Sequence, residues 1–173
     1  LGKDAGAAAT GIDDCVLIGS GAGGGATLTG HDNIMIGSSA GSVMTSGASN
    51  VFIGHQAGVA TTTSSGSTAV GTNALGNADS GGTNTAIGNS TLYETTGYDN
   101  TAVGHIAGSA ITSGHNNLVR GHNAGLSTSP SGSITSGSDT ICLGDNDIND
   151  LFCADTSISS SDSRDKTDVT NFT

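Results

Sequence analysis

The stretch "NTAVGHIAG", residues 100–108, contains the pattern that organises nearly the whole chain. A short β-branched segment ends at Gly104, and an alanine follows three residues later. Aligning the chain on this repeat glycine gives eight related segments, from "CVLIGSGAG" at residue 15 to "TICLGDNDI" at residue 140. They are spaced 16–18 residues apart, except for a last spacing of 23. The repeat glycines are Gly19, Gly37, Gly54, Gly71, Gly88, Gly104, Gly121 and Gly144.

A fixed period near 17 residues is typical of a solenoid. Each repeat combines an alternating, β-branched stretch, which predicts a strand, with a stretch rich in Gly, Asn and Asp, which predicts turns. Helical periodicity is absent. We therefore expect an all-β fold, a parallel β-solenoid (β-roll or β-helix) of about eight coils over residues 11–150. Residues 1–10 would form an N-terminal lead-in segment before the solenoid, and residues 151–160 would form a junction after it.

The composition excludes several classes of function. Leu, Ile, Val and Phe make up only about 18% of the 173 residues, which indicates disorder unless a strict repeat lets small residues stack. The net charge is −11, and no Lys or Arg occurs between Lys3 and Arg120. Neither nucleic acid nor an anionic membrane is therefore an expected partner. No apolar run is long enough for membrane insertion. Leu1 is not an initiator methionine, so we expect a piece of a longer protein.

Successive side chains of a strand point to opposite faces, and this alternation predicts which of them line the interior of the coil. The two flanking columns, one and three residues before the repeat glycine, share one strand face and are expected to line the interior. Alanines three residues after the glycine are expected to pack behind them. The flanking columns are Ile18, Ile36, Ile53, Val70, Ile87, Val103, Arg120 and Leu143, and Val16, Ile34, Val51, Thr68, Thr85, Thr101, Leu118 and Ile141. The alanines are Ala22, Ala40, Ala57, Ala74, Ala107 and Ala124.

The middle column, two residues before the repeat glycine, is then expected to point outward. It contains no polar residue in eight repeats, and a continuous apolar column on an outer face predicts an association surface. Small alanines at its centre would let neighbouring backbones approach closely. We expect a homotrimer with this column as its interface; scattered surface apolar residues are the alternative. The column is Leu17, Met35, Phe52, Ala69, Ala86, Ala102, Val119 and Cys142.

The repeat "NTAIGxxxL…TTGYDNTAVGHIAG" resembles the repeats of bacteriophage tail fibres and, more distantly, the heads of trimeric autotransporter adhesins. The C-terminal "SDSRDK" is similar to the start of the intramolecular chaperone domain of tail spikes and fibres, the endosialidase-type peptidase family S74. Residues 161–173 would be the beginning of that domain, whose body is missing from this chain. The resemblance implies a segment of a virion tail fibre, which lies outside the cell and takes part in host attachment and adhesion.

The same resemblance implies an autocatalytic cleavage that releases the chaperone. The cut would fall between Ser160 and Ser161, with Ser161 as nucleophile and Lys166 as its general base. A serine hydroxyl needs such a base, and a lysine of lowered pKa can supply it. Asp162 and Arg164 match the motif and would shape the turn and pair across chains. A charged, solvated chain end is the alternative. No turnover enzyme is expected.

Three other features suggest binding sites. His55, His105 and His122 directly follow the repeat glycine; the latter two lie in adjacent coils and could share a metal, although surface histidines are the simpler interpretation. Arg120 interrupts an apolar column, so it either binds an anion or carboxylate near the axis or, as we prefer, marks a local outward shift.

An acidic stretch near the C-terminus is the remaining candidate for a metal site. We interpret this stretch as a solvated turn, with a Ca²⁺ site as the alternative. No other cofactor is predicted. The candidate ligands are Asp145, Asp147 and Asp150, followed by Asp155. The cysteines, Cys15, Cys142 and Cys153, are interpreted as small apolar fillers, with an intermolecular bridge as the alternative.

Four functions compete. A structural or receptor-binding fibre segment, with a host receptor or glycan as partner, fits the motifs best. A bacterial trimeric adhesin head is the alternative, which a C-terminal membrane anchor in the parent gene would favour. An ice-binding solenoid fits less well, because the column of Thr68, Thr85 and Thr101 continues with Leu118 and is expected to face inward. A glycan-cleaving enzyme needs paired carboxylates, yet Glu94 is the sole glutamate.

Overall fold

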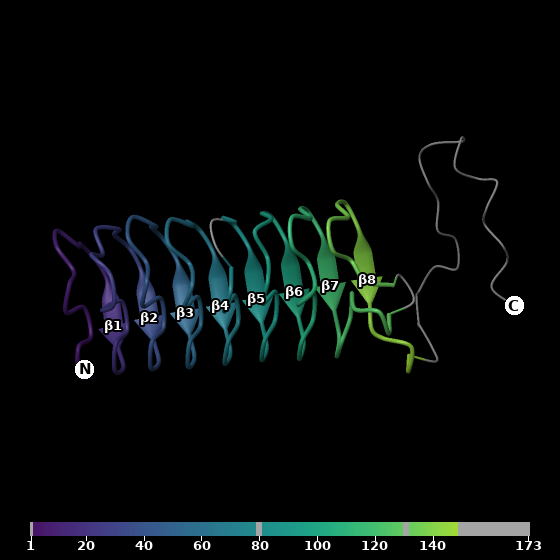
Figure 1. The fold of residues 1–173 in the computed structure, drawn as a ribbon, viewed down its shortest axis with the longest axis horizontal. Helices are drawn as coiled ribbons and strands as arrows, with labels where there is room; N and C mark the ends of the chain where they lie inside the picture. The colour runs from purple at the N-terminus through teal and green to yellow at the C-terminus, as the bar shows by residue number, and fades with distance from the viewer. Residues whose placement is uncertain (1, 79–80, 130–131, 149–173) are drawn as a thin grey trace, which may run out of the picture.

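The computed structural model describes residues 2–78, 81–129 and 132–148, and shows a rod of stacked coils (Figure 1). Eight short strands form one parallel sheet in sequence order, which confirms the predicted parallel β-solenoid. Every neighbouring pair is in register, so equivalent residues of successive repeats are stacked. The strands are β1 (Val16–Ile18), β2 (Ile34–Ile36), β3 (Val51–Ile53), β4 (Thr68–Val70), β5 (Thr85–Ile87), β6 (Thr101–Val103), β7 (Leu118–Arg120) and β8 (Ile141–Leu143).

The repeat glycine fixes the turn that ends each strand. Gly54 and Gly71 both have a φ of 136°, a conformation that L side chains rarely adopt. A Cβ built on Gly71 would lie 2.5 Å from the carbonyl oxygen of Gly88 in the next coil. The chain therefore needs glycine here for two reasons, its backbone angle and the close approach of the next coil.

The interior of the coil is lined by the middle column, and this corrects the predicted direction of the strands. Met35 and Phe52 are fully buried, as are the alanines of β4, β5 and β6. Leu17, at the first coil, is partly buried and packs against this core. A three-residue strand turns one side chain to one face and two to the other. Here the single side chain points inward and both flanking columns point outward.

Two positions that meet in the core, the middle column and the residue four after the repeat glycine, are filled in a complementary way. Where the middle column holds Phe52, the residue four after the repeat glycine is Gly58, whose added Cβ would lie 2.5 Å from the Phe52 ring. Where the middle column holds Ala69, the equivalent residue is Leu75, which is 1% exposed although its φ is 52°. The next repeat has the same combination, Ala86 with Leu92. In these three coils a large residue therefore comes from one of the two positions and not from both.

The predicted alanines, three residues after the repeat glycine, are all fully buried and form the other wall of the core. They pack against the middle column, not against the flanking columns as expected. Their backbone amides bond to the repeat glycine of their own coil, as Ala57 N–H does to the Gly54 carbonyl at 3.3 Å. Small residues at this position leave the interior of the narrow coil to larger side chains such as those of the middle column.

A buried ladder of polar residues replaces hydrophobic packing at the start of the strands. Asn100 Nδ2 donates to the Gly114 carbonyl at 2.9 Å, and Asn100 Oδ1 accepts from the Asn117 backbone at 3.1 Å. Asn33, Asn50 and Asn84 make corresponding bonds in their own coils. Among the described residues no buried side-chain nitrogen or oxygen lacks a hydrogen-bond partner, so this polar column ties successive coils together.

The described part of the chain contains no helix long and apolar enough to cross a membrane.

Candidate association surface

The flanking columns form one exposed, regular face along the sheet, which we call the strand face. In-register pairing places Val16, Ile34 and Val51 in one line and Ile18, Ile36 and Ile53 in a parallel line. Exposure is about 41% for Val16 and 43% for Ile18, large values for β-branched apolar residues within a strand. Both lines continue to β8, where Ile141 is 70% exposed. The strand face is therefore apolar along the whole sheet, apart from three threonines and one arginine.

Polar columns border the strand face on both sides. The first rim lies five residues before the repeat glycine, and all eight of its residues have a φ between 53° and 70°. Aspartate, asparagine and glycine tolerate this left-handed conformation, which explains the polar composition of the column. The first rim is Asp14, Asp32, Ser49, Gly66, Thr83, Asp99, Asn116 and Asp139.

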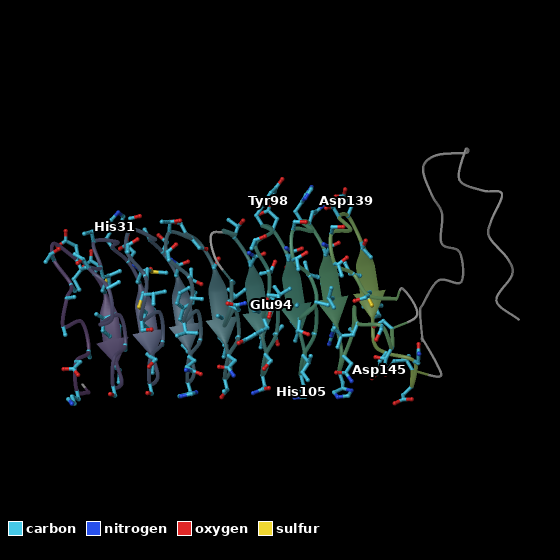
Figure 2. All side chains as sticks on the ribbon, viewed as in Figure 1. His31, Glu94, Tyr98, His105, Asp139 and Asp145 are labelled. Atoms are coloured by element: carbon cyan, nitrogen blue, oxygen red, sulfur yellow. The ribbon has the colours of Figure 1, made fainter. Side chains whose placement is uncertain are left out.

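The second rim lies directly after the repeat glycine, at the opposite edge of the strand face. In Figure 2, Asp139 and Tyr98 of the first edge and His105 and Asp145 of the second project from opposite sides of the rod. An apolar centre between polar rims is the usual anatomy of a protein interface. The second rim is Ser20, Ser38, His55, Thr72, Asn89, His105, His122 and Asp145.

The strand face is large enough to mark an interaction site. Eight coils at about 4.8 Å and a width of about three residues give about 38 Å by about 10 Å, or about 400 Å². Contiguous apolar patches of this size on soluble proteins are often functional. The strands of the face repeat in register along the rod (Figure 1), so an identical face can pack against it coil by coil.

The predicted trimer interface is wrong in its residues, because the middle column lies inside the coil. Phe52, Val119 and the alanines are fully buried in the single chain, and Cys142 is 3% exposed, so they cannot contact a neighbouring chain. The composition of the columns indicates which of them is buried. The middle column has no polar residue, whereas the flanking columns contain Thr68 and Arg120, which a dry interior does not accommodate without partners.

Arg120 points outward with the rest of its column. Its register is regular, with Val103 and Leu143 as its neighbours in β6 and β8. Arg120 therefore faces outward as predicted, but no local shift of the strand accompanies this orientation. The whole column faces outward.

The histidines of the second rim form a short ladder. The rings of His105 and His122 stack with centroids 5.4 Å apart and planes at 6°, so the predicted proximity is confirmed. His122 Nδ1 lies 3.0 Å from Asp145 Oδ2, and this hydrogen bond lowers the pKa of the Asp145 carboxyl group. His55 is separated from this pair by Thr72 and Asn89.

The described residues contain no group of three or more histidines, cysteines or acids placed to hold a metal ion. Asp145 instead caps a turn, where its Oδ1 accepts the Asp147 backbone N–H at 3.1 Å. Asp150 and Asp155 lie outside the described residues.

A shallow pocket at the first rim was not predicted. Asp99, Asn116 and Asp139 occupy one column of consecutive coils there, and Asn116 Nδ2 donates to Asp139 Oδ1 at 2.7 Å. Beside them the Tyr98 and His115 rings stack with centroids 4.8 Å apart. The sequence signal was the alignment of "GYDN" with "GHNN" one period later. The pocket is lined by Asp99, Thr101, Asn116, Asn117, Leu118, Asp139 and Ile141.

The residues of the predicted cleavage junction, Ser160, Ser161, Asp162, Arg164 and Lys166, lie outside the described residues. Cys153 does too. Cys15 is partly buried, and Cys142 fills the last position of the buried middle column.

No family model matches the chain, and comparisons with curated proteins and with solved structures gave no match.

Proposed function

We propose that this chain is a structural segment of a trimeric viral tail fibre, in which three solenoids associate through their strand faces. The fibre is part of the virion, and its C-terminal residues 161–173 begin an intramolecular chaperone. The supporting observation is the largely apolar strand face, which extends from β1 to β8 between two polar rims. The resemblance of the repeat and of "SDSRDK" to tail fibres supports the same assignment.

The two rims of the strand face differ in composition, and a cyclic trimer would bring them together. In a cyclic trimer every contact is heterologous, so the first rim of one chain meets the second rim of the next. The first rim carries aspartates such as Asp99 and Asp139, and the second carries His55, His105 and His122. At the level of Asp99 and His105 a carboxylate of one copy then lies near an imidazole of its neighbour, whereas at the level of Asp139 and Asp145 two carboxylates meet.

Replacing Ile53 with aspartate should dissociate the trimer and leave the solenoid folded. Ile53 lies on the strand face in β3 and is 36% exposed in the single chain, so the coil can accept a charge there. In the trimer, three carboxylates would be buried against apolar partners, at a cost of several kcal/mol. Sedimentation equilibrium should change from trimer to monomer, while the circular dichroism spectrum stays that of a β-protein.

Val43→Asp is the matched control. Val43 is also an exposed aliphatic residue, 37% accessible, but it lies in the turns six residues after Gly37 and away from the strand face. This variant should remain trimeric. A wild-type chain that sediments as a stable monomer, or equal dissociation of both variants, would contradict the proposal.

The same strand face gives one observation in favour of ice binding. Thr68, Thr85 and Thr101 project outward in register, so the inward orientation that counted against this function does not hold. An ice-binding face must stay open to water, and thermal hysteresis by a monomeric wild-type chain would therefore favour this second function over the fibre.

The chaperone junction has a separate test. In the full-length gene product, Ser161→Ala and Lys166→Ala should each block release of the C-terminal domain, because the first removes the nucleophile and the second its base. The fibre part should stay trimeric. Intact mass spectrometry checks both, with Ser160→Ala as a control that retains the motif serine. Unimpaired cleavage of the Ser161→Ala variant would refute the assignment.

A bacterial trimeric adhesin head remains the alternative within the same architecture. The strand face supports both equally, since both are trimeric solenoids by resemblance. The sequence that follows residue 173 in the parent gene distinguishes them: a chaperone body indicates the fibre, and a membrane anchor indicates the adhesin. A host receptor or glycan is the proposed partner in either case.

A further inference from the structure

Arg120 is one of only four basic residues in an acidic chain. Lys3 and Arg120 are the only lysine and arginine among the residues that the structure describes. Arg120 is exposed on the strand face and makes no salt bridge with any described residue. Asp145, which follows β8 in the next coil, is already hydrogen-bonded to His122. The guanidinium group thus has unused donors on an otherwise apolar surface.

In a trimer with threefold symmetry, the guanidinium groups of three Arg120 residues would lie at the same level along the axis. The inference rests on the proposed trimer, in which strand faces of three copies surround a common axis parallel to the stack of coils. Equivalent residues then lie at one height, and packed sheets are about 10 Å apart, which is within reach of arginine side chains. Three guanidinium groups would meet between the levels of Val103 and Leu143.

Three such groups cannot share an apolar interface without an anion. Arginine does not lose its proton in proteins, so repulsion cannot be relieved by deprotonation. Buried charges must be paired, and the planar fork of a guanidinium group matches an oxyanion by parallel hydrogen bonds. A tetrahedral anion offers enough oxygens to accept from three arginines at once.

We propose that the Arg120 residues of three copies hold one inorganic oxyanion, of the phosphate or sulfate class, on the axis of the assembled fibre. No copy holds the site alone. The ion fixes the relative height of the three chains, because any slip along the axis would separate the guanidinium groups. Arg120 thereby sets the register of an interface whose other levels are nearly identical.

Titration of the wild-type trimer with inorganic phosphate at pH 7.5 tests the site. Isothermal calorimetry should give one phosphate for every three chains, and millimolar phosphate should raise the melting temperature in a saturable way. Arg120→Leu, which matches Leu143 in the same column, should abolish the saturable response while the protein stays trimeric. Arg120→Lys keeps the charge without the fork and should weaken phosphate binding at least tenfold.

The outcomes separate this inference from the proposed function. A trimeric wild type that binds no phosphate, or binds one per chain, overturns the axial site and leaves the trimer intact. A monomeric wild type overturns both. If Asp145→Asn creates phosphate binding that the wild type lacks, a carboxylate of the chain occupies the site and the free anion is excluded.

Discussion

Replacing Gly71 with alanine should strongly destabilise the solenoid. The residue has a φ of 136°, and its added Cβ would lie 2.5 Å from the Gly88 carbonyl oxygen and 2.7 Å from the carbonyl carbon. Backbone strain alone costs about 1–3 kcal/mol, and the overlap with the next coil must be relieved by separating strands. A loss of at least about 3 kcal/mol is a large part of the usual 5–15 kcal/mol of stability. Urea unfolding, followed by circular dichroism, measures it.

Gly66→Asn is the control for this prediction. Gly66 also has a positive φ, 70°, but only the Thr83 methyl group, at 3.4 Å, lies near an added Cβ. The same column already holds Asn116 at a φ of 53°. The variant should change stability by less than about 1 kcal/mol. If Gly71→Ala is tolerated as well as Gly66→Asn, the close approach of successive coils is not what requires the repeat glycine.

A double substitution in the third coil should recover most of what each single change removes. Phe52→Ala empties the largest buried side chain of the core and should cost about 3–5 kcal/mol. Gly58→Leu places a Cβ 2.5 Å from the Phe52 ring and should cost about 3 kcal/mol through overpacking. Together they recreate the combination of Ala69 with Leu75 in the fourth coil, so the double variant should lie within about 2 kcal/mol of the wild type.

Unfolding of the four proteins at one fixed concentration gives the coupling free energy, because assembly makes apparent stability depend on concentration. Losses that add in the double variant would show that the two sites do not share one volume. Leu75 and Leu92 demonstrate that leucine is accepted at this left-handed position, with φ values of 52° and 48°.

Much of this fold was predictable from the sequence. The glycine spacing predicted the period, the parallel register and the positions of all eight strands, because in-register stacking makes each repeat align with the next. It also predicted that His105 and His122 are neighbours. The rim pocket at Asp99 and Asn116 was not predicted, since it depends on which turn residues adopt left-handed angles and so project together.

The amino-acid sequence by itself determined that the chain is a β-solenoid, where its strands lie, and that three of its columns are apolar. Only the tertiary structure decided which of those columns is inside. Period-2 alternation divides a strand into two faces but leaves open which face is buried. Here the width of the coil decides, because the narrow interior, closed by alanines, accommodates only the single middle side chain of each strand, such as Phe52. The two flanking columns, including Ile53 and Arg120, are therefore left on the outside as the surface available to another chain.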